Sequence, residues 1–364
     1  MIKINNKSEC CGCFACKNIC PRNAILMIED DKGFKYPSIN HNSCINCGLC
    51  EKVCPIKADI REKKTLPKSY AAINIEENIR MKSSSGGIFS LIAEHIINND
   101  GIVFGAAFND KFLVEHIKIN NIEYISKVRG SKYIQSDINY TYKEAKKYLE
   151  AGKKVLFTGT PCQIEGLQKY LLKEYENLYT QDLICHGVPS KKVWKKYLEY
   201  RKKEDKDNIQ DIYFRSKENK GWNEYQVLFK YQNKNKYIDH LKDIFMRIFL
   251  SDIALRDSCY NCKFKKKNRN SDITLADFWG INEILPSMND EKGTSLLIVN
   301  SKKGERILNQ IKESIILKEV DFEQSIKNNK SMIKSSEINN NTKEFFKDLE
   351  KLNLDELVFK YIQE

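Results

Sequence analysis

One cysteine pattern occurs twice near the start of this 364-residue chain and constrains its fold more than any other feature. Each copy reads Cys-x2-Cys-x2-Cys-x3-Cys-Pro, and the two copies hold Cys10, Cys13, Cys16 and Cys20, then Cys44, Cys47, Cys50 and Cys54. Three cysteines at this spacing wrap a tight turn around one iron–sulfur cube, and the fourth, before proline, ligates the other cube. The pattern therefore predicts two 4Fe-4S clusters. Their ligands would be a first set of Cys10, Cys13, Cys16 and Cys54, and a second set of Cys20, Cys44, Cys47 and Cys50.

The alternative for closely spaced cysteines is structural zinc, which takes four ligands, commonly as two Cys-x2-Cys pairs. Two complete runs favour iron–sulfur clusters, so we expect residues 1–60 to form an α+β ferredoxin-like domain. Cys11 is surplus, and we interpret it as a bystander. The chain has thirteen cysteines but neither a secretory signal nor an 18-residue apolar run. We therefore expect metal ligands rather than disulfides, a cytoplasmic protein and no membrane span.

The remaining sequence predicts three further segments. Residues 61–69 are charged and contain Pro67, which indicates a linker and a separable N-terminal domain. Residues 70–300 alternate short apolar runs with helical patterns, which is typical of an α/β domain. Strands are expected at 101–108, 154–159, 178–184, 209–215 and 294–300, and helices at 88–99, 142–152, 164–175 and 191–203. Residues 301–364 are expected to form a helical C-terminal tail.

Four later cysteines, the third set, suggest another cluster: Cys162, Cys185, Cys259 and Cys262. Cys162 and Cys185 each follow a predicted strand, and one helix connects the two strands. Because such a unit is right-handed and parallel, both thiols are expected at the same edge of the sheet. Cys259 and Cys262 form a Cys-x2-Cys that can bind two irons of one cube. We expect a third 4Fe-4S cluster, the alternative being two buried cysteines and an isolated zinc-type pair.

Other residues near these cysteines leave more than one interpretation open. His186 adjoins Cys185 and is either a satisfied hydrogen-bonding residue or a proton donor near the redox centre. The basic run 263–269 is either a solvated loop, charge compensation for a cluster, or a docking site for an acidic donor. Trp222 and Trp279 are interpreted as core or cofactor-packing residues.

Three loops rich in small residues predict a nucleotide site. Residues 83–97 pass from a Ser/Gly turn into an amphipathic helix, whose first N–H groups can hold phosphate. Residues 129–136 and 157–163 are similar loops. Together they favour a flavin nucleotide, whereas the absence of a GxGxxG motif disfavours a standard NAD-type Rossmann site.

The order of several motifs resembles the β-subunit family of coenzyme F420-reducing hydrogenases and dehydrogenases, often fused to a two-cluster ferredoxin domain. The motifs are SSSGGIFS (83–90), VRGSKYIQS (128–136), LFTGTPCQIEGL (156–167), DLICHGVPS (182–190), LRDSCYNCKFK (255–265), SDITLADFWGI (271–281) and KGTSLLIVN (292–300). The resemblance implies FAD near an iron–sulfur cluster. It implies that the flavin is held by Ser84, Ser85, Gly86, Gly87, Gly130, Ser131, Lys132, Tyr133, Gly159, Thr160, Pro161 and Gln163.

The net charge of +12 does not indicate nucleic-acid binding. Three cubes at roughly −2 each and a pyrophosphate would offset about eight charges, and no nucleic-acid motif is present. We therefore expect an oxidoreductase that passes electrons between the clusters and a two-electron partner at FAD. That partner would be coenzyme F420 or a small organic acceptor, and ferredoxin or another redox protein would serve the cluster side. The alternative is a non-enzymatic relay subunit of a hydrogenase, dehydrogenase or reductase complex.

Overall fold

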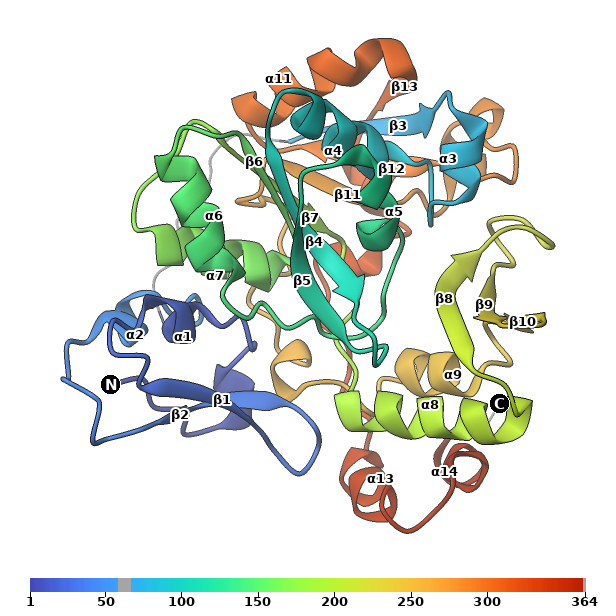
Figure 1. The fold of residues 1–364 in the computed structure, drawn as a ribbon. Coiled ribbons are helices and arrows are strands. Elements are labelled where there is room, and N and C mark those ends of the chain that lie inside the picture. Colours follow the sequence, from blue (N-terminus) through green and yellow to red (C-terminus); the bar gives the residue numbers. More distant parts are fainter. Residues whose placement is uncertain (58–66, 363–364) are drawn as a thin grey trace.

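The computed structural model describes residues 1–57 and 67–362, and its core is an eight-stranded mixed sheet with the strand order β13-β3-β12-β11-β7-β6-β4-β5 (Figure 1). The central strands are parallel: β4 (Ile102–Phe108), β6 (Val155–Thr158), β7 (Leu178–Leu183) and β11 (Ile273–Asp277). Antiparallel strands extend both sides: β5 (Val114–Ile119), β12 (Ser295–Val299), β3 (Lys68–Asn74) and β13 (Ile315–Val320). The predicted α/β class is confirmed as a mixed α/β fold.

Helices cover both faces of this sheet because its central strands are apolar on both sides. Val103 of β4 packs toward one helical layer, and its neighbour Phe104 packs toward the other. One layer contains α6 (Thr141–Glu150) and α7 (Pro161–Leu171), and the other contains α4 (Ile88–Asn98), α5 (Ile125–Val128) and α11 (Lys302–Ile311). Short helices lie at α3 (Glu77–Met81), α10 (Ile281–Ile284) and α12 (Phe322–Ile326).

A second lobe is built around a separate antiparallel sheet of β8 (Ile209–Ser216), β9 (Gln226–Tyr231) and β10 (Asn235–Asp239). Its helices are α8 (Lys191–Asp205), α9 (Ile244–Leu250), α13 (Thr342–Asp348) and α14 (Leu354–Tyr361). Trp194 and Phe214 are buried at its centre. The strand predicted at 209–215 is therefore present, but it does not belong to the main sheet.

The N-terminal segment packs directly on α7. It contains α1 (Ala15–Ile19), the hairpin strands β1 (Ile25–Glu29) and β2 (Lys35–Ile39), and α2 (Leu49–Lys52). Phe14 and Ala15 are buried in one core with Leu167 of α7. A side chain at Gly166 would place its Cβ 2.8 Å from Cys13 Cβ, so glycine permits this close approach. The N-terminal segment therefore shares a hydrophobic core with α7.

The C-terminal region contains the helices expected of it and one strand that was not expected. Within 301–364, Ile315–Val320 forms β13 and pairs antiparallel with β3. The backbone N–H and C=O groups of β13 are satisfied by β3, which is distant in the sequence. The local residue pattern does not reveal such a long-range pairing. Of the predicted linker 61–69, residues 61–66 lie outside the described residues, and Lys68 begins β3. No described helix is both long and apolar enough to cross a bilayer.

Candidate functional site

The second cysteine set surrounds a small cavity at the N-terminal end of the molecule. The cavity is lined by Cys20, Cys44, Cys47 and Cys50. The Ile2 amide lies 3.2 Å from Cys50 Sγ, and the Ala24 amide lies 3.3 Å from Cys20 Sγ. Backbone N–H groups at these positions would stabilise thiolate sulfurs. Cys47 is exposed, so this set reaches the surface.

The first cysteine set gathers beside α1 and α7. Burial, followed by the nearby thiols of Cys10 and Cys54, raises the pKa of Cys16. The pKa of Cys13 is also raised: Cys11 lowers it, but burial and the nearby thiols of Cys16 and Cys54 raise it. Among residues 1–57 and 67–362, no group of three or more His, Cys, Asp or Glu side chains could hold a single metal ion.

The third cysteine set lines one further cavity, formed where β6 and β7 end. These strands are parallel neighbours, so Cys162 in the first turn of α7 and Cys185 after β7 emerge together. Cys259 and Cys262 complete the lining. Burial raises the pKa of Cys259 to about 12, so at neutral pH its thiol would ionise only beside a cation such as an iron.

The residues outside the ligand set that line this cavity include Cys11, Lys265 and Arg269. Cys11 adjoins Cys10 of the first set in the sequence and lines this cavity together with Cys162, so the surplus thiol lies between the first and third sets. Nε of the buried Arg269 has no hydrogen-bond partner in the described chain, and its Nη1 forms an ion pair with Asp182 Oδ2 at 3.5 Å. Three cations of the basic run 263–269 pair with carboxylates of the protein, Lys266 with Glu165, Lys267 with Glu323 and Arg269 with Asp182, so the interpretations of this run remain predictions.

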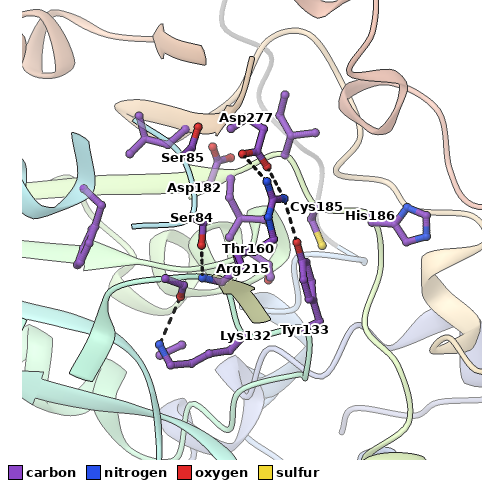
Figure 2. Close-up of a pocket in the computed structure, with 18 of the residues that line it drawn as sticks. Ser84, Ser85, Lys132, Tyr133, Thr160, Asp182, Cys185, His186, Arg215 and Asp277 are labelled. Atoms are coloured by element: carbon purple, nitrogen blue, oxygen red, sulfur yellow. Dashed lines mark hydrogen bonds and ion pairs between the residues drawn. The ribbon is translucent and has the colours of Figure 1, made fainter. Parts of the chain in front are cut away.

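A larger cavity of about 550 Å³ opens at the carboxyl ends of the parallel strands, between the sheet and the second lobe (Figure 2). This is the edge of an α/β sheet where ligands bind, and its volume is in the range of cofactor sites. All predicted flavin-binding residues line it except Gly86 and Pro161. A Cβ on Gly86 would lie 2.3 Å from Ala72 O, so this glycine serves strand packing. Pro161 instead lines the third-set cavity.

The three loops are joined by hydrogen bonds. Ser131 N–H donates to Ser84 Oγ at 2.8 Å, which links two loops (Figure 2). Lys132 Nζ donates to the carbonyls of Arg129 and Gly130, at 3.0 and 3.3 Å. Burial lowers the pKa of Lys132 to about 8, so its ammonium remains mostly charged at neutral pH. The cavity wall therefore carries a cation suited to an anionic ligand.

A buried histidine joins the other two loops. His116 Nε2 is 2.7 Å from Thr158 O, and its Nδ1 is 2.9 Å from Ser136 Oγ. Gln163 Nε2 donates to the same Ser136 hydroxyl, and Thr160 N–H donates to Gln163 Oε1 at 3.0 Å. Burial lowers the pKa of His116 to about 4, so the ring is neutral. His116 was not among the residues predicted from the sequence, because it lies on β5, away from every recognised motif.

An ion pair between the two lobes forms the opposite wall. Arg215, at the end of β8, binds both carboxylate oxygens of Asp277 at 2.9 and 3.1 Å and lies over the Tyr225 ring (Figure 2). Trp222 donates to Asp277 and stacks on Trp279, whose ring lines the cavity. This fits the expected packing role of both tryptophans. Arg215 and Asp277 were missed, although a charged residue ending an apolar strand was an available signal.

Two buried polar atoms on the cavity wall lack partners in the described chain. They are Gln181 Oε1 and Arg215 Nε. An unsatisfied buried polar group is costly, so such groups commonly serve a bound ligand or water. Together with Lys132 and the open space beside Gly130, where the nearest atom to a Cβ would be 3.8 Å away, they fit a polar nucleotide.

His186 lies where the large cavity and the third-set cavity meet. Its Nε2 is 2.5 Å from Asp252 Oδ1, and its ring packs edge-on against Phe249. Figure 2 shows the ring directed away from the other labelled side chains. The segment 185–188 lines both cavities, so Cys185 and His186 separate them by one layer of protein.

Two segments of the chain match known protein families. Residues 152–325 match the family described as the C terminus of the coenzyme F420 hydrogenase/dehydrogenase beta subunit, and residues 9–58 match the 4Fe-4S dicluster domain. A coenzyme F420-dependent sulfite reductase from Methanocaldococcus jannaschii is 24% identical over 328 residues, covering 88% of this chain. The chain spans about half the length of that relative, 49%.

A chain from the F420-reducing NiFe hydrogenase complex of Methanosarcina barkeri superposes with a TM-score of 0.49 at 15% identity. The match covers 74% of this chain and 93% of that one. The chain therefore has an N-terminal segment that matches the 4Fe-4S dicluster domain and a later segment that matches the C-terminal domain of the coenzyme F420 hydrogenase/dehydrogenase β subunit.

Proposed function

We propose that this protein is an iron–sulfur flavoprotein oxidoreductase. It would pass electrons between three 4Fe-4S clusters and a two-electron partner that reacts at FAD in the large cavity. The main observation behind the proposal is that the two cavities are adjacent. The segment 185–188 lines both the third-set cavity and the large cavity. A redox group held by the third cysteine set would therefore adjoin a nucleotide-sized site.

The order of the cysteine sets supports a directed path. Cys47 of the second set is exposed, whereas the cysteines of the third set are partly buried and line a cavity beside the large one. The first set would lie between them, since Cys11 within its loop lines the third-set cavity beside Cys162. A one-electron protein such as a ferredoxin would exchange electrons near Cys47, at the end of the path farthest from the large cavity.

The chain's own residues would bind and orient the flavin. Lys132, with the amides of the loop that follows Gly130, would bind the pyrophosphate. Tyr133 and Trp279 offer aromatic surface on the cavity wall. FAD supplies the exchange between hydride and single-electron chemistry when it is bound. His186 remains a candidate proton donor, with Asp252 as the group that orients it.

The two-electron partner is proposed to be coenzyme F420 or a small organic acceptor. The relative from Methanocaldococcus jannaschii is named as F420-dependent, and the family is named for the same coenzyme. Anaerobically purified full-length protein should contain about twelve iron per chain and release FAD on denaturation. Reduced F420 should then bleach the visible absorbance of the clusters. Release of FMN, or of no flavin, would contradict the assignment.

A substitution in the cavity tests the flavin site separately. Gly130→Val should lower FAD content while iron content stays unchanged, because its side chain projects into the open cavity. Gly152→Val is the matched control, since Gly152 also has a positive φ and no atom lies within 4 Å of its Cβ position. Equal FAD content in the two variants would place the flavin elsewhere.

A non-enzymatic relay role is the second candidate. The chain covers only half of the sulfite reductase it resembles, so a partner protein could carry out the reaction with the final substrate. Hydride exchange by the purified chain alone with F420, a nicotinamide or an organic acceptor would favour the enzyme. Reduction by viologen donors without any such exchange would favour the relay.

A further inference from the structure

The side chain of Arg256 is fully buried, with 0% exposure, at the junction of the first and third cysteine sets. Its Nε donates to Cys10 O at 2.7 Å, and its Nη2 donates to Lys35 O at 2.9 Å. Its Nη1 donates to Gln135 Oε1 at 3.2 Å. The guanidinium also lies over the ring of Tyr36, 4.3 Å from its centroid.

The charge of Arg256 has no acidic partner within residues 1–57 and 67–362. Its oxygen acceptors are two backbone carbonyls and one amide, all of which are neutral. Carbonyls satisfy the N–H groups but leave the net charge unbalanced, and a buried unpaired cation is strongly unfavourable. The remaining contact is Nη2 to Cys10 Sγ at 3.5 Å. Cys10 belongs to the first set, and a 4Fe-4S cube with four thiolates carries roughly −2.

The backbone of the same residue belongs to the loop of the third set. Arg256 precedes the 3-10 helix η3 (Asp257–Cys259), and its carbonyl accepts from the Cys259 amide at 2.8 Å. Gln135, its amide partner, lines the large cavity and donates to Cys11 O at 2.9 Å. Gly12 makes room for this arrangement: its φ is +68°, and a Cβ there would lie 2.9 Å from Gln135 and 3.0 Å from Arg256.

We infer that Arg256 is a positioning residue that couples the first cluster to the third. Its buried charge offsets the charge of the first cluster and raises the reduction potential of that cluster. Its backbone and Gln135 hold the first-set loop against the third set and the large cavity. The inference rests on the proposed function, since it requires a cluster at the first set.

The test is a redox titration of the full-length, iron-loaded protein followed by electron paramagnetic resonance. Arg256→Met should lower the midpoint potential of one cluster by about 59 mV or more. At a fixed potential, this corresponds to at least a tenfold fall in the ratio of reduced to oxidised cluster. Arg256→Lys keeps the charge and should shift the potential less. Lys17→Met is the control, because Lys17 follows Cys16 but is only partly buried and should be screened by water. Cys10→Ser identifies the affected signal.

The outcomes separate the inference from the proposed function. If the native protein binds no clusters, both fail. If it binds three clusters and Arg256→Met leaves every potential unchanged, only the inference is overturned. If Arg256→Met loses the first cluster while Arg256→Lys retains it, the requirement for charge is supported. Loss of that cluster in both variants would show a purely structural role and overturn the electrostatic one.

Discussion

We expect acidic pH to destabilise the protein by protonating one buried side chain on the wall of the large cavity, His116. Thr158 O can only accept, so Nε2 of His116 carries the proton and Nδ1 accepts from the Ser136 hydroxyl. Protonation of Nδ1 would deprive this hydroxyl of its acceptor and would place a charge in the core. The bonds that join the loops around Ser136 and Thr158 would then weaken.

The direction and size of the effect follow from the pKa of His116. Burial lowers it to about 4 in the folded chain, against roughly 6.5 in the unfolded chain. Between these values the unfolded chain binds more protons, so stability is complete above pH 6.5 and declines as pH falls toward 4. The loss between pH 7 and pH 5 is about 2 kcal/mol in the free energy of unfolding.

Denaturant unfolding at pH 7, 6 and 5 measures this loss. His116→Phe retains a ring against Phe157 but cannot titrate, so its stability should fall about 2 kcal/mol less than that of the native chain. At pH 7 the variant should itself be about 1–3 kcal/mol less stable, because Thr158 O and Ser136 lose a partner. His41→Gln, at an exposed histidine, should follow the native chain. Equal losses in the native chain and His116→Phe would refute the reasoning.

Three further changes test particular contacts. Cys259→Ser should reduce iron from about twelve to about eight per chain after anaerobic reconstitution, and a loss of all iron would contradict independent sites. Gly166→Leu should displace Cys13, cost about 1–3 kcal/mol and lower the thermal midpoint, and an unchanged midpoint would argue against the tight contact. Gly86→Ala should lower the thermal midpoint even without flavin, since its Cβ would collide with Ala72 O. An effect on flavin content alone would show instead that Gly86 contributes to flavin binding.

The sequence determined the features that depend on local spacing. Cysteines two residues apart share one turn, so the second set could be assigned before the fold was known and is found around one cavity. The positions of Cys162 and Cys185 after consecutive parallel strands likewise placed both thiols at one sheet edge. The same reasoning found the loops of the large cavity, since strand ends and helix starts carry local signals.

Only the tertiary structure decided the contacts between distant segments. Arg215 and Asp277 belong to different sheets, and Arg256 reaches Cys10 across 246 positions of the chain. The burial of Phe14 on α7 joined two regions that a charged linker had seemed to separate. Periodicity and turn chemistry act over a few residues, whereas these contacts arise when whole layers pack together. The sequence alone therefore does not distinguish Arg256 from a surface arginine. Its role depends on the surrounding residues, which bury the charge and exclude water from it.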